Sequence, residues 1–460
     1  MPYEAQSWRN VSPGDLSIEL PEVQPTEVEP VLRAAANAMW TWARAPMEER
    51  FVLLRAAQKS VEAKKEELAI GISIETGKPI TEARGEVGAV IAKFDLTIED
   101  ATAELGQREI VNGPHPAFVR RLARGPAAVV GPFNFPLHLG NGALLAHLAA
   151  GNPVIFKPSP LAAVVAQSYA DLMTPCFPPG VFQLVQGGAA EGSAICLDPR
   201  VRAICFTGSV NVGKALARNL ADDFSKELAL ELGGRNATIV CEDADLELAA
   251  RAVADAMSLT CGQRCNSTSR ILVAESIRDR FIERLIVAME RFQPGDPLKD
   301  QTTLGPLISA SAMGRFEEMS RSTSDWLLTA QVRGEADGKK GYYVRPGIRL
   351  GAASADVESF VPIADLALFR DLDEAITLNN ASPFGLAVSV FTRSEAQFWR
   401  IAEEVRAGNI YANLPTTFSP STLPFGGVGL SGNGRPGGRG FIRFCSVEQA
   451  IQLGKGSFRC

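Results

Sequence analysis

The stretch AAVVGPFNFP, residues 127–136, decides the fold class. Its short run of small apolar residues ends in Gly and Pro, which is typical of a fully buried strand followed by a loop. Three similar runs follow, each separated from the next by a stretch with helical spacing: PVIFK (153–157), FQLVQG (182–187) and AICFTG (203–208). This alternation predicts βαβ units and an α/β fold whose parallel sheet is buried on both faces.

Function is expected directly after these strands, because ligands of a parallel sheet bind beyond the carboxyl ends of its strands. The segments at that position are GPFNFP (131–136), KPSP (157–160) and TGSVNVG (207–213). The third opens a helix, so its backbone N–H groups can bind a pyrophosphate. GVGLSG (427–432) also matches G-x-G-x-x-G, but neither a buried strand nor a helix flanks it, so we do not expect it to bind a dinucleotide.

The rest of the chain shows a second α/β region and two additional segments. Residues 27–105 have helical spacing and are expected to cover the sheet, with the second helix ended by Gly77 and Pro79. Residues 233–412 contain the strand candidates ATIV, SRILV and LAVSVF. Residues 106–124 are interpreted as a two-stranded excursion. At 460 residues, the chain is expected to form two or three domains.

Composition excludes several classes of protein. The formal net charge of −6 argues against a nucleic-acid or anionic-membrane partner. No uncharged apolar run is long enough to span a bilayer, and the first residues, MPYEAQSWRN, lack the pattern of a secretory signal. The eight cysteines are scattered, which predicts reduced thiols and a cytoplasmic location rather than a disulfide framework.

The stretch CGQRCNSTSR (261–270) places Cys261 and Cys265 four residues apart. A tetrahedral metal site needs about four ligands. The chain has only three histidines and no second close cysteine pair, so no metal site is expected. A disulfide between residues four apart on a helix is also disfavoured. One thiol could instead be a nucleophile, which requires an oxyanion donor and a group that promotes release of the acyl product.

Two other residues could serve such a thiol. Asn134 is an amide donor after the first strand, and Glu231, in LALELGG, ends another apolar run. A carboxylate in apolar surroundings has a raised pKa and can act as a general base near neutral pH. Taken singly, these residues and Cys265 also fit ordinary structural roles: a turn amide, a surface carboxylate and an inert core thiol.

Together they lie in motifs that resemble the aldehyde dehydrogenase superfamily from about residue 25 to 450. In the order of the family, the motifs are ETGKP (75–79), GPFNFP (131–136), AGNPVIFKPS (150–159), FTGS (206–209), LELGG (230–234), GQRC (262–265), GDP (295–297) with LGPLIS (304–309), and PFGGVGLSGNGR (424–435). The resemblance implies an aldehyde dehydrogenase-like fold with three parts.

The implied parts are a Rossmann-type NAD(P)-binding domain, an α/β catalytic domain and a small β oligomerisation element. Their expected boundaries are 1–105 with 125–232, 233–412, and 106–124 with 446–460, while the Gly/Pro-rich residues 413–445 close the active site. The family builds oligomers by extending such a β element across subunits. A homodimer or homotetramer is therefore expected.

The resemblance also implies a mechanism. Cys265 would attack the aldehyde to form a thiohemiacetal, whose oxyanion is bound by Asn134 and the Cys265 backbone N–H. Hydride transfer leaves a thioester, and Glu231 would activate the water that hydrolyses it. The implied cofactor is NAD, with NADP as an alternative, and its expected contacts are Phe133, Lys157, Ser159, Gly208, Ser209, Gly213, Glu358 and Phe360. Cys261 has no implied role and is interpreted as a packed thiol.

Two departures from the family pattern bear on the cofactor. Pro160 stands where the family often has a glutamate that would repel a 2′-phosphate, which makes NADP more plausible than usual. Val361 replaces the glycine of the family's E-x-F-G-P motif, which predicts an altered loop on the nicotinamide side.

Within the superfamily, the chain is most similar to the succinylglutamate semialdehyde dehydrogenases of bacterial arginine catabolism. The likeness rests on NFPLHLGNG (134–142), LVQGG (184–188), the arginine of GQRC and SGNGRP (431–436). It implies a carboxylated semialdehyde such as N-succinylglutamate 5-semialdehyde as the substrate. Arg264 and Arg435 are candidates for binding its carboxylates, although ordinary loop salt bridges explain them equally well.

Two other functions stay open. One is a related enzyme that uses the same thiol, either to transfer the acyl group to CoA or to oxidise another aldehyde. The CoA-acylating enzymes need no hydrolytic base, so Glu231 in its ELGG setting argues against that activity. A catalytically silent binding protein would keep the fold and lose turnover. The presence of Cys265, Asn134 and Glu231 argues against that reading.

Overall fold

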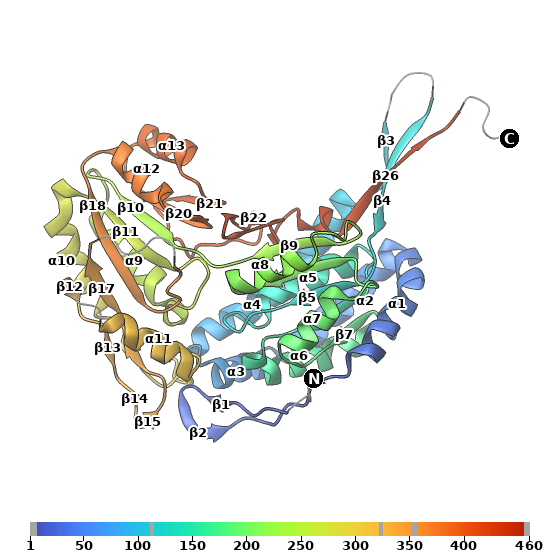
Figure 1. Ribbon diagram of the computed structural model, residues 1–460, viewed down its shortest axis with the longest axis horizontal. Coiled ribbons are helices and arrows are strands. Elements are labelled where there is room, and N and C mark those ends of the chain that lie inside the picture. The colour runs from blue at the N-terminus through green and yellow to red at the C-terminus, as the bar shows by residue number, and fades with distance from the viewer. Residues whose placement is uncertain (1–6, 111–114, 322–324, 352–356, 455–460) are drawn as a thin grey trace.

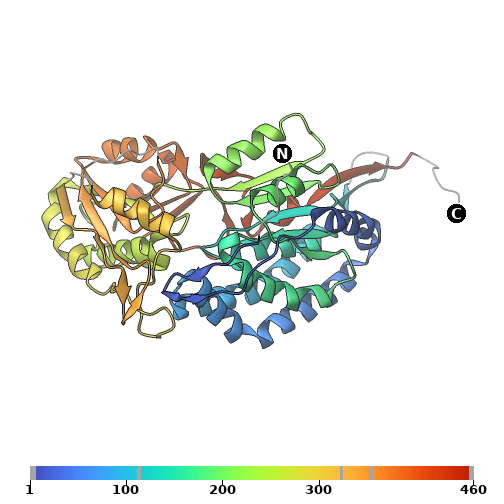
Figure 2. The same ribbon diagram turned by 60° about the horizontal axis from the view of Figure 1, so that its bottom comes forward.

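Two lobes lie side by side in the protein, and a thin β arm projects from one of them (Figures 1 and 2). The computed structural model describes residues 7–110, 115–321, 325–351 and 357–454. Each lobe has its own sheet and its own buried apolar core. No helix in these ranges is both long and apolar enough to cross a membrane.

The first sheet confirms the predicted parallel strands. Its order is β24-β9-β8-β5-β6-β7, and the five strands from β5 to β9 run parallel. Their bounds are β5 (Ala127–Val130), β6 (Val154–Lys157), β7 (Phe182–Leu184), β8 (Ala203–Thr207) and β9 (Glu227–Glu231). The connecting helices are α5 (His138–Ala149), α6 (Ala163–Met173), α7 (Ala189–Leu197) and α8 (Val210–Asn219). The central strands β5, β6 and β8 are almost entirely buried, which explains their continuous apolar sequences.

The predicted helical region contains four helices: α1 (Val28–Arg44), α2 (Met47–Ala63), α3 (Lys65–Thr76) and α4 (Ile80–Glu104). The second predicted helix is therefore two helices, which meet at Lys64, where φ is −116° and ψ is 19°. Its expected end is confirmed: Gly77 has a φ of 73°, and a Cβ atom there would lie 2.5 Å from Pro306. Only glycine satisfies both demands.

The second sheet has the order β12-β17-β18-β11-β10-β20-β21, and every pair except β12–β17 is parallel. Its strands are β10 (Asn236–Val240), β11 (Thr268–Ala274), β12 (Asp325–Leu328), β17 (Gly347–Leu350), β18 (Ile363–Phe369), β20 (Ala387–Phe391) and β21 (Asn409–Ala412). Its helices are α9 (Leu246–Ser258), α10 (Arg278–Met289), α11 (Ala310–Ser320), α12 (Leu372–Asn380) and α13 (Glu395–Glu404). Strands β10, β11 and β20 confirm the three strand candidates of this region.

The Gly/Pro-rich segment returns from the second lobe to the first sheet. It forms β22 (Pro424–Phe425), β23 (Val428–Gly429), β24 (Gly432–Asn433) and β25 (Gly437–Gly438). β24 pairs antiparallel with β9, so that Gly432 lies opposite Glu231, and β23 pairs with β19 (Phe384–Gly385). The GVGLSG stretch therefore forms short strands, and no helix opens from it, as expected. The sequence did not predict its pairing with β9.

The arm is a three-stranded antiparallel sheet of β3 (Arg108–Ile110), β4 (Ala117–Ala123) and β26 (Ser446–Gln452). β4 lies between the other two strands, which confirms the predicted excursion and C-terminal strand. Residues 111–114 and 455–460 of the expected oligomerisation element lie outside the described residues. The domain boundaries and the role of the arm in assembly stay predictions.

Short strands complete the fold at the base of the two lobes. They are β1 (Val11–Ser12), β2 (Asp15–Glu19), β13 (Gln331–Val332), β14 (Glu335–Ala336), β15 (Lys339–Lys340) and β16 (Val344–Arg345). They form three antiparallel pairs, β1–β2, β13–β16 and β14–β15. In Figure 1 these pairs lie along the lower edge of both lobes, away from the arm.

Candidate active site

The thiol of Cys265 lies where two cavities meet. After α9 the chain turns sharply through a 3-10 turn at Leu259–Gly262, where Thr260 and Cys261 have positive φ. Gly262 permits this path, because a Cβ atom there would lie 2.6 Å from the Pro362 nitrogen. Cys265 follows this turn, is partly exposed and lines both cavities.

The first cavity, of about 470 Å³, lies at the carboxyl edge of the first sheet. The last residues of four parallel strands line it: Val130, Lys157, Thr207 and Glu231. It brings together most of the predicted site residues: Phe133, Asn134, Lys157, Ser159, Gly208, Ser209, Glu231, Cys265, Glu358 and Phe360. Gly213 does not line it. That glycine lets α8 pack closely on Leu232, whose side chain would be 2.8 Å from a Cβ atom.

Glu231 is a buried carboxylate without a hydrogen-bond donor. Its side chain ends β9 and is 2% exposed, and neither carboxylate oxygen accepts a hydrogen bond from the described residues. Burial raises the pKa of Glu231 to about 8, with a further increase from Glu358, while the neighbouring Cys265 thiol lowers it in part. Glu231 can therefore exchange a proton near neutral pH.

The two cysteines of the CGQRC stretch differ in access. Burial raises the pKa of Cys265 well above its usual value, and the carboxylates of Glu231 and Glu358 raise it further. The Asn266 backbone N–H and Arg264 oppose this shift. The thiol therefore needs a base to become nucleophilic. Cys261 is 1% exposed, belongs to the core of the second lobe and lines neither cavity.

Two N–H donors belong to residues that line the first cavity and have no acceptor within the described residues. Asn134 is 3% exposed in the loop between β5 and α5, and its side chain makes no hydrogen bond with the described residues. Within the same ranges, the backbone N–H of Cys265 also donates to no acceptor. Buried donors are normally paired, so two free donors at one cavity fit an oxygen atom that arrives with a ligand.

The far part of this cavity fits a dinucleotide. Ser209 caps α8, whose first turn carries no acidic residue, so its N-terminus can accept a pyrophosphate. Lys157 is 4% exposed, its Nζ donates to the Pro158 carbonyl at 3.0 Å, and burial lowers its pKa to about 8. Gly208 packs against the Phe206 ring, and a Cβ atom there would lie 2.6 Å from that ring.

The side of the cavity where the nicotinamide is expected is formed by a loop of the second lobe. Glu358 accepts a hydrogen bond from the Gly234 N–H at 3.1 Å, and burial raises its pKa to about 7. Phe360 adopts a φ of 51° and contacts Phe133 edge to face, with ring centroids 6.0 Å apart. Val361, which replaces the family's glycine, is buried in the core of the second lobe.

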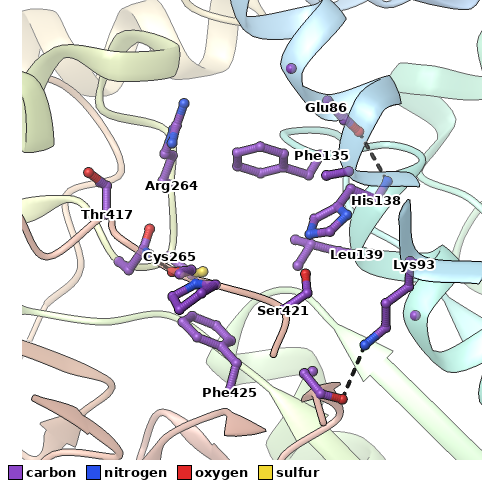
Figure 3. Close-up of a pocket in the computed structure, with 18 of the residues that line it drawn as sticks. Glu86, Lys93, Phe135, His138, Leu139, Arg264, Cys265, Thr417, Ser421 and Phe425 are labelled. Carbon is purple, nitrogen blue, oxygen red and sulfur yellow. Dashed lines mark hydrogen bonds between the residues drawn. The ribbon is translucent and has the colours of Figure 1, made fainter. Parts of the chain in front are cut away.

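The second cavity, of about 330 Å³, lies on the other side of Cys265 (Figure 3). It is lined by α4, the start of α5 and the Gly/Pro-rich segment. Arg264 lines it and forms an ion pair of 2.6 Å with Glu82, while its guanidinium stacks on Phe135. Arg435 lines a separate hollow beside Tyr411 and does not line this cavity.

Lys93 lines the second cavity and was not among the site residues predicted from the sequence. It belongs to a stripe of α4 that also contains Glu82, Glu86 and Ala89 and that faces the cavity. Spacings of three and four residues place these side chains on one helix face. The sequence signal that could have identified Lys93 is a lysine on the face of a helix that is otherwise predicted to be buried.

Comparison with known proteins shows which family the chain belongs to. The model of the "Aldehyde dehydrogenase family" matches residues 4–451. N-succinylglutamate 5-semialdehyde dehydrogenase 1 of Caulobacter vibrioides is 36% identical over 418 residues, which cover 89% of this chain and 88% of the relative. The N-succinylglutamate 5-semialdehyde dehydrogenase of Salmonella heidelberg is 37% identical and covers 92% and 87%.

Solved structures show the same fold. The NAD-dependent aldehyde dehydrogenase of Sinorhizobium meliloti superposes with a TM-score of 0.91 at 31% identity, covering 98% of this chain and 92% of the other. A 1-pyrroline-5-carboxylate dehydrogenase from Thermus with bound NAD has a TM-score of 0.91 at 27% identity, covering 97% and 90%. From the family match and these relatives it follows that the chain belongs to the aldehyde dehydrogenase family.

Proposed function

We propose that this enzyme oxidises a carboxylated semialdehyde, such as N-succinylglutamate 5-semialdehyde, to the acid, with NAD as the oxidant and Cys265 as the nucleophile. The observation that carries the proposal is that Cys265 lines two cavities, one of which it shares with the unpaired buried carboxylate of Glu231 and with the free Asn134 amide. The names of the relatives support the substrate class.

The first step is the addition of the thiol to the aldehyde. Glu231 takes the thiol proton, and the Cys265 sulfur bonds to the carbonyl carbon. The oxygen becomes an oxyanion, which accepts hydrogen bonds from the Asn134 side chain and the Cys265 backbone N–H. Both donors are free in the structure, so binding the oxyanion breaks no existing hydrogen bond.

The remaining steps are oxidation of the bound aldehyde and hydrolysis of the thioester. When bound by Lys157, Ser209 and Glu358, NAD supplies the acceptor for the hydride that leaves the tetrahedral carbon. Glu231 releases the proton it took from the thiol to solvent, and its ionised carboxylate then takes a proton from the water that attacks the resulting thioester. The acid departs as Glu231 returns this second proton to the Cys265 sulfur. In sum, the aldehyde is oxidised by two electrons and one water is consumed.

Transfer of the acyl group to CoA is the competing outcome. It requires the same thiol but no base for water. The burial of Glu231 and its pKa of about 8 favour hydrolysis, because activating water for attack on the thioester needs a base, whereas acyl transfer to CoA has no water to activate.

An assay of several aldehydes with NAD and NADP in parallel tests the proposal. N-succinylglutamate 5-semialdehyde with NAD is expected to give the highest kcat/KM, and added CoA is expected to leave the rate unchanged. Pro160 in place of an acidic residue makes the NADP arm necessary, because no carboxylate at that position repels a 2′-phosphate. Equal rates with simple alkanals would contradict the substrate class, and no reduced cofactor with any aldehyde would contradict the function.

Assembly and location belong to the same proposal. β26 and β3 form the two edges of the arm, and Leu122 and Val447 are exposed on it at 37% and 43%. Such edges are rarely left unpaired in a native protein. Light scattering at micromolar concentration is therefore expected to give a dimer or a dimer of dimers, and a monomer would contradict this. The free cysteines of the described residues fit the reducing cytoplasm.

A further inference from the structure

The charged side chains of the second cavity leave one cation without an anion. Arg264 pairs with Glu82 at 2.6 Å. Glu86 accepts from Lys78 and from the backbone N–H groups of Leu137 and His138. Lys93 is the remaining charged group of the lining, and no carboxylate of the described residues lies within 4.0 Å of its Nζ.

Lys93 is deeply buried for an unpaired cation. Its side chain is 6% exposed, and Nζ donates a single hydrogen bond, to the Gly438 carbonyl at 3.2 Å. Asp100 is the carboxylate that raises the pKa of Lys93. It already accepts hydrogen bonds from Arg439 Nε at 2.9 Å and from the Gly440 N–H at 2.8 Å. Two of the three N–H bonds of the Lys93 ammonium therefore have no protein acceptor within the described residues.

A buried ammonium is costly unless an anion lies beside it. Burial lowers the pKa of Lys93, Arg439 lowers it further, and Asp100 only opposes these effects. A carboxylate brought by a ligand would restore the pKa of Lys93 and provide acceptors for its free N–H bonds. The His138 ring adds no competing charge, because burial lowers its pKa to about 4.

We propose that Lys93 binds a carboxylate of the aldehyde substrate and thereby selects anionic aldehydes. Figure 3 shows Arg264 and Cys265 on one side of the cavity and Lys93 on the opposite side. Ser421 and Phe425 of the Gly/Pro-rich segment line the same cavity. An aldehyde whose carbonyl is at Cys265 can thus extend its carboxylate towards Lys93. The inference rests on the proposed function for the aldehyde end alone.

The other role for Lys93 is structural: its hydrogen bond to Gly438 would hold the Gly/Pro-rich segment on α4. A glutamine separates the two roles, because its amide can donate a hydrogen bond to the Gly438 carbonyl but carries no charge. Lys93→Gln is therefore the informative variant. Lys59→Gln, at an exposed position on α2, removes the same charge far from the cavity and serves as the matched control.

The experiment compares N-succinylglutamate 5-semialdehyde with its dimethyl ester, which has the same skeleton and no charge. Lys93→Gln is expected to raise the KM for the charged aldehyde about 10- to 100-fold, the usual effect of losing one charge-assisted hydrogen bond. The KM for the ester is expected to stay within about threefold of the parent value, because the ester offers no anion to Lys93. Lys59→Gln is expected to change neither.

Equal losses on both substrates, or no loss on either, would overturn the proposal for Lys93. A wild-type enzyme that oxidises neither aldehyde would instead contradict the proposed function. In that case calorimetry with N-succinylglutamate still tests Lys93, because binding an anion needs no turnover. The proposal requires that Lys93→Gln weaken this binding at least about tenfold relative to Lys59→Gln, and unchanged binding overturns it.

Discussion

Replacing Cys265 by alanine is expected to abolish aldehyde oxidation, with a loss of at least ~10⁴-fold in kcat, the range found when a covalent nucleophile is removed. Without the sulfur, the carbonyl carbon never becomes the tetrahedral centre that can release hydride. Formation of reduced cofactor after mixing with substrate measures the effect. The variant is expected still to bind NAD, as measured by calorimetry, because the residues expected to contact the cofactor lie on other strands and loops.

Cys261→Ala is the matched control for this variant. Cys261 is buried in the core of the second lobe and lines neither cavity, so its loss removes packing but no reacting group. Most turnover should remain. If Cys261→Ala were inactive while Cys265→Ala kept its activity, the two assignments would have to be exchanged.

Replacing Glu231 by glutamine is expected to slow steady-state turnover by ~10²–10⁴-fold, because the amide has the shape of the carboxylate but cannot accept a proton. The steps before hydrolysis can still proceed, although thiol addition becomes slower because Glu231 no longer takes the thiol proton. Rapid mixing should then give a burst of up to one equivalent of reduced cofactor per site, followed by slow turnover. A mass increase on the peptide that contains Cys265 would identify the trapped acyl group.

The pH dependence follows from the same carboxylate. Glu231 must be ionised to act as a base, and its pKa is raised to about 8, so thioester hydrolysis by the wild type should rise with pH and level off above that value. The glutamine variant should lose this rise. A slower burst would show that Glu231 also takes the thiol proton, whereas unchanged steady-state turnover would remove it from the mechanism.

The first sheet and most of the candidate site could be predicted because local sequence encodes them. A strand buried on both faces must be apolar along its whole length, so β5, β6 and β8 stand out. The rule that ligands bind at the carboxyl ends of parallel strands then leads to Asn134, Lys157 and Ser209, which all line one cavity. Their roles rest on the family resemblance rather than on this rule.

The features that were missed depend on contacts between distant parts of the chain. The break at Lys64 falls between good helix formers and has no Gly or Pro to announce it. The pairing of Gly432 with Glu231 joins residues about two hundred positions apart, and nothing local indicates it. Lys93, on α4, is recognised as a buried cation only once the fold places the Gly/Pro-rich segment, with its Gly438 carbonyl, beside it.

The pairing of β24 with β9 constrains how the protein can be made. Translation delivers β5 to β9 early, but the free edge of β9, which ends in Glu231, is covered only after residue 433 has been synthesised. Until then the first lobe exposes a strand edge of the kind that pairs with other chains. Arm strand β4 likewise waits for β26 on one side. Nascent chains halted before the Gly/Pro-rich segment should therefore aggregate or recruit chaperones, although every parallel strand of the first sheet has already left the ribosome.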